Sequence, residues 1–161
     1  MKSFEVVQAD LFNSTETNDI LRLLSSYAVD IMGGGEDLSD EVRKKLIPAL
    51  QKRSGVFIFL AYHESTAIGL AICFEGFSTF YAQPLINIHD FVVEKNYRGQ
   101  GIAKLLLQKI EQKANTIGAC KLTLEVLEGN VRAQNVYKAF GFAGYELDKS
   151  MGKAIFMDKK L

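Results

Sequence analysis

The sequence carries no excess of charge of either sign, which limits the partners that it can bind through its general surface. Lys and Arg together number 19, and so do Asp and Glu, so the formal net charge is zero. Proteins that bind nucleic acid or anionic membranes in this way usually have a basic excess, so we expect neither partner. The balance still allows a local charged pocket.

Cysteine and long apolar runs are also scarce. Cys73 and Cys120 do not have the spacing of a metal site, so we expect buried free thiols and no bound metal. The longest apolar run, Val56–Tyr62, is far shorter than a membrane span. Met1–Asp10 has no apolar core of signal-peptide length, which favours a cytoplasmic protein.

The patterns that are present alternate between helix and strand over a length that suits one domain, 1–161. In chain order they predict a strand at 4–7, a helix that opens at Ser14 or Thr15, a helix at 41–52 opened by Ser39, strands at 55–63, 67–74 and 86–94, a helix at 101–117, a strand at 121–127, a helix at 131–140, and strands at 142–147 and 153–157. The order β-α-α-β-β-β-α-β-α-β-β is that of a mixed α/β domain.

Glycine and proline mark two expected interruptions in the first half. Three consecutive glycines, Gly33–Gly35, must end the first helix because they cost too much backbone entropy inside it. Pro48 falls inside the second helix and predicts a kink or a break there.

The most informative stretch runs from Asp90 to Lys104, where a central strand enters a glycine loop that opens a long helix. Glycines 99 and 101 let the backbone approach a ligand, and the first helical turn directs unpaired N–H groups outward. Such a turn suits a phosphate or pyrophosphate, and Arg98 can add charge at its mouth. A plain glycine turn is a second interpretation. A dinucleotide fingerprint is a third, although Lys104 replaces its last glycine.

Two spaced motifs resemble one family. The pattern Arg98-x-x-Gly101-x-Ala103 resembles the signature of the GCN5-related N-acetyltransferases, the GNAT superfamily. Downstream, Asn130-x-x-Ala133-x-x-x-Tyr137-x-x-x-Gly141-Phe142 resembles the second half-motif of that family. Within the family, 88–104 and Phe140-Gly141 are most similar to diamine and polyamine acetyltransferases of the spermidine/spermine type. Those enzymes have Glu-Asp where this chain has His89-Asp90.

The resemblance implies a GNAT-like fold with a splayed pair of central strands, and acetyl-CoA as co-substrate. The pyrophosphate would lie on the amides of the glycine loop, and the pantetheine arm would run along the central strand. One strand amide would polarise the acetyl carbonyl. The residues that the resemblance assigns to the cofactor are Phe91, Val92, Val93, Arg98, Gly99, Gln100, Gly101, Ile102, Ala103, Lys104 and Asn130. Asn130 can equally serve as the N-cap of the last helix.

The resemblance also suggests a general acid and a base. Tyr137 would protonate the leaving thiolate, or else pack its ring in the core. His89 would accept the proton of the incoming ammonium, or else form hydrogen bonds in the core. Strand alternation puts His89 and Asp90 on opposite faces unless the strand bulges. Glu94 could relay protons or be a solvated charge.

The function expected from these features is transfer of an acetyl group to a primary amine of a small molecule, such as a diamine or polyamine. The acceptor pocket would be walled by the Gly33–Ser39 loop and the 74–81 segment. The acidic residues in or next to these segments are Glu36, Asp37, Asp40 and Glu75. A peptide or protein N-acetyltransferase and a non-catalytic acyl-CoA-binding domain are alternatives, and a nicotinamide-dependent reductase is a more distant one. By analogy with the family we expect a homodimer, with the strands at 142–147 and 153–157 as candidate contacts.

Overall fold

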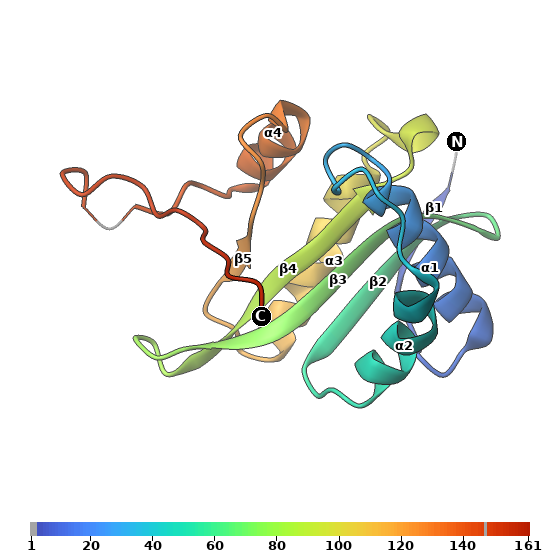
Figure 1. Ribbon diagram of the computed structural model, residues 1–161. Helices are drawn as coiled ribbons and strands as arrows, with labels where there is room; N and C mark the ends of the chain where they lie inside the picture. The colour runs from blue at the N-terminus through green and yellow to red at the C-terminus, as the bar shows by residue number, and fades with distance from the viewer. Residues whose placement is uncertain (1–2, 147) are drawn as a thin grey trace. The chain divides into compact units, whose positions relative to one another are not determined.

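Apolar, β-branched and aromatic residues of the first 127 residues build one five-stranded sheet (Figure 1). The strands, in order across the sheet, are β1 (Phe4–Gln8), β2 (Val56–His63), β3 (Thr66–Ser78), β4 (Gln83–Val93) and β5 (Leu122–Leu124). Neighbouring strands are antiparallel except β4 and β5, which are parallel. The computed structural model describes residues 3–146 and 148–161.

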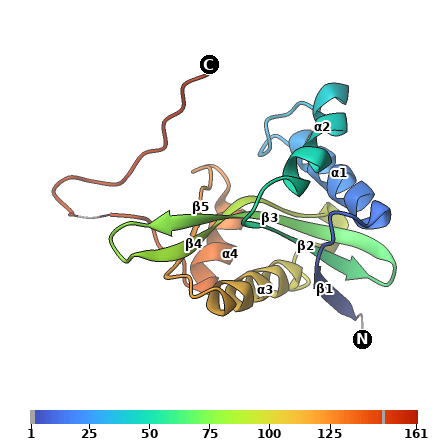
Figure 2. The ribbon, with the colours of Figure 1, turned by 90° about the horizontal axis from the view of Figure 1, so that it is seen from below.

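Helices cover both faces of this sheet. The helices α1 (Ser14–Ala28) and α2 (Asp40–Gln51) lie on one face, and α3 (Ile102–Thr116) lies on the other (Figure 2). Gly69 of β3 allows the close approach of α3, because a Cβ there would be 3.2 Å from Leu106 and 3.3 Å from Ile102. The buried core on the α1 and α2 side consists of Ile20, Leu23, Leu24, Leu50, Ile58, Leu60, Ala67, Leu70, Ile72 and Val92.

The ends of α1 differ from the predicted ones. Asn13, rather than Ser14 or Thr15, is the N-cap, and its side chain accepts hydrogen bonds from the amides of Thr15 and Glu16. The helix ends at Ala28, before the three glycines, because the chain folds back on its last turn. A Cβ at Gly33 would lie 2.0 Å from the Tyr27 carbonyl oxygen, so only glycine fits this turn.

The helix α2 begins as predicted, with Ser39 as its N-cap, but it continues unbroken through Pro48. Proline at this position removes the N–H that would bond the carbonyl of Lys44, and Lys44 is exposed. Water can therefore satisfy that carbonyl, and the expected break is absent.

The strands in the middle of the chain form at the predicted places but differ in length from the prediction. β3 extends to Ser78, beyond the predicted end at residue 74, whereas β5 is limited to three residues. The short 3-10 helix η1 (Lys95–Tyr97) separates β4 from the glycine loop. Cys73 and Cys120 are free thiols, and burial raises the pKa of Cys73 to about 12.

The last 34 residues, Glu128–Leu161, form a second compact unit, which we describe by itself. It contains the helix α4 (Val131–Phe140), whose bounds agree with the prediction. That the whole chain is a single domain stays a prediction.

The two C-terminal strands predicted at 142–147 and 153–157 are not formed. Residues 142–146 and 153–157 are irregular, and Leu147 lies outside the described residues. An Asp148 turn and a backbone hydrogen bond from Ala154 to the Tyr145 carbonyl (3.3 Å) link the two segments. Ile155, Phe156 and Met157 are all largely exposed. A two-stranded hairpin by itself is marginal in water, so this unit alone does not favour the ladder.

Among the residues that the structure describes, no helix has both the length and the apolar character needed to cross a bilayer.

Candidate active site

A β-bulge in β4 brings His89 and Asp90 to the same face of the sheet. In the β3–β4 register Ile72 pairs with Asp90 and Cys73 pairs with Ile88, so His89 is the additional residue. Asp90 therefore shares the α1 and α2 face with Ile72, and the His89 ring meets Phe74 of that face edge-on at 5.4 Å. Strand alternation alone would have put His89 and Asp90 on opposite faces, and the bulge is the exception that the sequence analysis allowed for.

The environment of the bulge is electrostatically distinct. Burial raises the pKa of the Asp90 carboxyl, and the neighbouring His89 opposes this shift. On α1, burial and then the charges of Asp90 and Asp30 raise the pKa of Tyr27. His89 itself is exposed, so the alternative of a buried core histidine is wrong. The bulge thus places an accessible imidazole next to a half-buried carboxyl.

The central strands separate as the splayed pair requires. β4 pairs with β5 from Ile86 to Ile88, opposite Leu122–Leu124, and β4 then runs on to Val93 beyond the end of this pairing. The side of β4 beyond Ile88 is where we expected the pantetheine arm.

The ladder decides which main-chain groups of β4 face that side. The Glu94 amide bonds the Ile68 carbonyl of β3 at 2.9 Å, and Val92 pairs with Leu70. Because main-chain groups point alternately to the two sides of an antiparallel strand, those of Val92 face β3. Those of Phe91 and Val93 face the side that β5 leaves. The expected main-chain contact of Val92 with the pantetheine arm is therefore wrong. Phe91 and Val93 keep an orientation that suits such a contact.

The glycine loop has the geometry of an anion cradle. Gly99 and Gly101 adopt left-handed φ angles of 77° and 85°, and a Cβ on either would meet nothing within 4 Å. Gly101 is the N-cap of α3, and among the described residues no side chain caps the first amides of that helix. Amides at a helix start that lack a side-chain acceptor, beside open space, suit a phosphate group.

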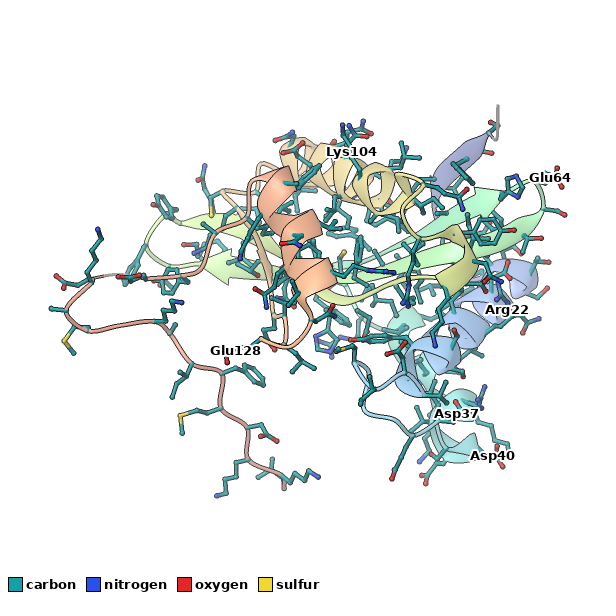
Figure 3. All side chains as sticks on the ribbon, turned by 90° about the horizontal axis from the view of Figure 1, so that it is seen from above. Arg22, Asp37, Asp40, Glu64, Lys104 and Glu128 are labelled. Carbon is teal, nitrogen blue, oxygen red and sulfur yellow. The ribbon has the colours of Figure 1, made fainter. Side chains whose placement is uncertain are left out.

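The side chains around the loop differ in what they can offer. Ile102 is buried in the core and can contribute only its amide, and Ala103 is half-buried. The Gln100 side chain donates to the Asn96 carbonyl (3.0 Å), whereas Lys104 is exposed at the start of α3 (Figure 3).

Arg98 has a different position from the one expected. Its Nε donates to the Val93 carbonyl at 2.8 Å, and its guanidinium lies 3.8 Å from the Asp30 carboxylate. Arg98 therefore braces the turn, and Asp30 partly neutralises the charge that it was expected to add at the mouth.

Two acidic groups from the sequence analysis have local partners. Asp37 forms a 2.6 Å ion pair with Arg43, and Asp40 stands in the first turn of α2, where the helix dipole favours a carboxylate. Figure 3 shows both near α2, away from Lys104. Glu94, expected to be solvated or a proton relay, is ion-paired with Arg22 at 2.5 Å. Sequence reasoning missed Arg22 and Asp30, because no local pattern marks partners that lie dozens of residues away.

In the second unit, Asn130 and Tyr137 belong to one well-capped helix. The Asn130 side chain accepts a hydrogen bond from the Ala133 amide (3.2 Å), which confirms its role as N-cap. Tyr137 is buried, and its ring meets Phe142 edge-on at 5.8 Å. Packing against Phe142 is a structural role that does not conflict with a chemical role for the hydroxyl. The contact of Asn130 with the pantetheine arm and the acid role of Tyr137 stay predictions.

A mixed sheet with a bulged, splayed strand that leads through a glycine loop to a helix is the arrangement of a GNAT fold. The sequence profile of the acetyltransferase (GNAT) family matches residues 18–142. The chain belongs to this family, as the two motifs predicted.

Similar proteins agree with this assignment. A thialysine N-epsilon-acetyltransferase of Bos taurus is 35% identical over 74 residues, which cover 46% of this chain and 43% of that protein. A spermine/spermidine N(1)-acetyltransferase of Bacillus subtilis is 26% identical over 84 residues, covering 50% of this chain and 55% of that protein. The aligned parts thus span about half the length of these relatives. The predicted resemblance to polyamine-type members is confirmed.

The fold is also found in the crystal structure of an aminoglycoside acetyltransferase from an uncultured soil metagenomic sample. The two structures superpose with a TM-score of 0.79 at 16% identity, over 98% of this chain and 96% of the other. At this identity the likeness concerns the fold alone.

Proposed function

We propose that the protein is an acetyl-CoA-dependent N-acetyltransferase that acetylates a primary amine of a small molecule. The observation that carries the proposal is the continuous run from the bulge at His89, through the side of β4 beyond Ile88, to the left-handed glycines at the start of α3. This run offers an ionisable side chain, the strand side that β5 leaves and an anion cradle in the order in which an amine, a pantetheine arm and a pyrophosphate would need them.

The cofactor would be held chiefly by main-chain groups. A Cβ at Gly99 or Gly101 would meet nothing within 4 Å, so a pyrophosphate has room to approach the amides of Gly99–Lys104. Phe91 and Val93 direct their main-chain groups to the side that β5 leaves, and one of their amides would polarise the acetyl carbonyl. The group that the cofactor supplies is an acetyl thioester.

The chemistry proposed for the side chains conserves every proton. His89 accepts a proton from the ammonium group, and the half-buried Asp90 carboxylate stabilises the imidazolium that results. The freed amine attacks the acetyl carbonyl carbon, the new C–N bond forms and the C–S bond breaks. The leaving sulfur takes a proton from the Tyr137 hydroxyl, a role that rests on the second motif. The nitrogen loses its second proton as the amide forms, and that proton restores the Tyr137 hydroxyl, while the His89 imidazolium releases its proton to water.

An aliphatic amine fits the acceptor class best. The names of the two curated relatives describe acetylation of thialysine at N-epsilon and of spermine or spermidine at N1, which are terminal amines on flexible chains. At the bulge of this chain, the carboxyl group of Asp90 provides negative charge for such an ammonium group. We therefore propose a terminal aliphatic amine, as in diamines, polyamines and diamino acids.

Two measurements test the proposal. Calorimetry should detect binding of acetyl-CoA and none of NADH, and a thiol-release screen should show turnover with diamines, polyamines or thialysine. Turnover with peptides alone would instead identify a peptide or protein N-acetyltransferase. Binding without turnover on any amine would identify an acyl-CoA-binding domain. The homodimer and the cytoplasmic location stay predictions, and light scattering during size-exclusion chromatography tests the first.

A further inference from the structure

Arg22 joins three elements that are distant in the sequence. It lies on α1 beside the turn that follows β4 (Figure 3). One guanidinium nitrogen donates to Glu94 Oε1 at 2.5 Å, and the other donates to the main-chain carbonyl of Ala67 in β3, also at 2.5 Å. Asp19, one helical turn earlier, is 3.6 Å from the same guanidinium and accepts a hydrogen bond from Tyr62 (3.0 Å). The guanidinium is thus held in one orientation by two hydrogen-bond acceptors and a nearby carboxylate.

Glu94 is the residue at which the sheet ends and the glycine loop begins. Its amide makes the last bond to β3, at the Ile68 carbonyl, and its carbonyl accepts the amide of Tyr97 at 2.9 Å. The second bond closes the turn η1 that leads to Arg98 and the glycines. A shift of Glu94 would therefore move the whole approach to the anion cradle.

An acidic residue beyond the C-terminal end of α1 contacts the same turn. Just after the helix, the Asp30 carboxylate lies 4.0 Å from Lys95 and 3.8 Å from Arg98. Arg98 in turn donates to the Val93 carbonyl. The turn 94–98 is consequently held by a basic residue within α1 and by an acidic residue beyond its end, and the contact of Arg22 is the shorter of the two.

We infer that Arg22 is a positioning residue, which fixes the cofactor loop through Glu94. The inference rests on the proposed function, because it concerns the affinity for acetyl-CoA. Arg22 and Glu94 are partly exposed, with side-chain exposures of 45% and 27%, and such a pair adds little to global stability. The position of the amides that bind an anion is more sensitive, since small displacements of a binding group weaken the interaction strongly.

The test is a double-variant cycle on acetyl-CoA affinity, with Arg22→Gln, Glu94→Gln and the two combined. Each single variant should raise the Kd of acetyl-CoA by about threefold to tenfold, and the combination should raise it no further. Arg22→Lys keeps the charge opposite Glu94 but lacks the second fixed donor for Ala67, so it should fall in between. The value of kcat at saturating acetyl-CoA should stay within about twofold of the parent.

Lys45→Gln is the matched control. It breaks the Lys45–Glu41 ion pair of α2, which also measures 2.5 Å but is fully on the surface, and it should leave the Kd unchanged. Thermal melts accompany each binding measurement.

The outcomes separate this inference from the proposed function. Failure of the parent to bind acetyl-CoA would refute the proposed function itself. A parent that binds, together with Arg22→Gln and Glu94→Gln of unchanged Kd, would overturn only the role of Arg22, whatever the melting temperatures. If Arg22→Gln does not fold, Glu94→Gln decides the question, because it leaves the contact of Arg22 with Ala67 intact.

Discussion

The segment from β4 to α3 and the helix α4 carry the two GNAT motifs, but they offer chemically different groups. The first offers main-chain amides at the end of a strand and at the start of a helix, and its apolar side chains are largely used for packing. The second is an ordinary capped helix whose candidate contribution to the chemistry is a single phenol, Tyr137. Apart from His89 and Asp90 at the bulge, substitutions in the first region should act mainly on cofactor binding, and those in the second on turnover.

Removal of the Tyr137 hydroxyl should produce the largest effect. Tyr137→Phe keeps the ring that packs on Phe142 and deletes the proposed proton donor. We expect kcat to fall by roughly ten- to ten-thousand-fold, with little change in the Kd of acetyl-CoA. Steady-state kinetics and calorimetry on the same preparation provide both numbers.

Tyr145→Phe is the control in the same unit, since Tyr145 is 57% exposed and lies outside both motifs. An unchanged kcat for Tyr137→Phe would assign the phenol to packing alone. The thiolate would then take its proton from water.

His89→Gln probes the one ionisable side chain that the β4 bulge exposes. Glutamine preserves size and polarity but cannot accept a proton at these pH values. We expect kcat/KM to fall by about ten- to a hundredfold at neutral pH, with a loss that shrinks as rising pH supplies free amine. The acidic limb of the pH–rate profile should flatten. If the variant retained the acidic limb of the parent, His89 would not be the base.

Gly101→Ala tests the anion cradle, and Gly118→Ala is its matched control. Both glycines are left-handed, with φ angles of 85° and 69°, and a Cβ on either would meet nothing within 4 Å. Each alanine should therefore cost a similar roughly 1–2 kcal/mol of stability. Gly101 stands where amides point out of α3, whereas Gly118 follows the end where carbonyls do.

Only Gly101→Ala should weaken acetyl-CoA binding, by about tenfold, because its Cβ fills the space beside those amides. Calorimetry on the two folded variants measures the difference. Equal affinity in both variants would place the pyrophosphate somewhere other than this loop.

Local pattern predicted the first nine elements and the position of the glycine loop, because each depends on residues close in sequence. The apolar spacing of α3, the Asn130 cap and the Gly141 stop are of this kind. The prediction of the two C-terminal strands was wrong, because a strand also depends on residues that are distant in the sequence. Alternation of apolar residues predicts a strand only where another element covers one face, and Ile155 and Phe156 are exposed.

The site was predictable only in part. The loop glycines and Tyr137 are marked by motifs, but the bulge at His89 depends on the pairing of β4 with β3, which no single strand encodes. The bond of Arg22 to Glu94 likewise depends on how α1 packs at the end of β4, 72 residues further along the chain. The Val92 correction has the same origin, since the side to which an amide points follows from the ladder.

The smallest expected effect concerns the stability contribution of Asp90, and it has a definite sign. Burial raises the pKa of this carboxyl in the folded protein. A raised folded pKa means that the stability associated with Asp90 is complete below its unfolded pKa, near about pH 4, and is lost as the pH rises through the folded value. At neutral pH the ionised, partly desolvated carboxylate therefore weakens the fold.

Asp90→Asn should consequently melt a few degrees higher than the parent at pH 7, and the difference should vanish as the pH falls toward 4. The same variant should lower kcat/KM, because the imidazolium of His89 loses its neighbouring carboxylate.

Asp37→Asn is a control of opposite sign, since a backbone hydrogen bond from Leu38, assisted by Arg43, lowers the pKa of Asp37. Its loss should destabilise slightly at neutral pH, with a deficit that disappears in acid. Thermal melts from pH 4 to 8 on both variants make the comparison.

A lower melting temperature for Asp90→Asn at pH 7 would mean that hydrogen bonds to the carboxylate outweigh its desolvation, so that Asp90 would be a structural anchor of the bulge. A higher melting temperature of Asp90→Asn combined with weaker catalysis would show that the charged carboxylate beside His89 destabilises the fold but is needed for activity.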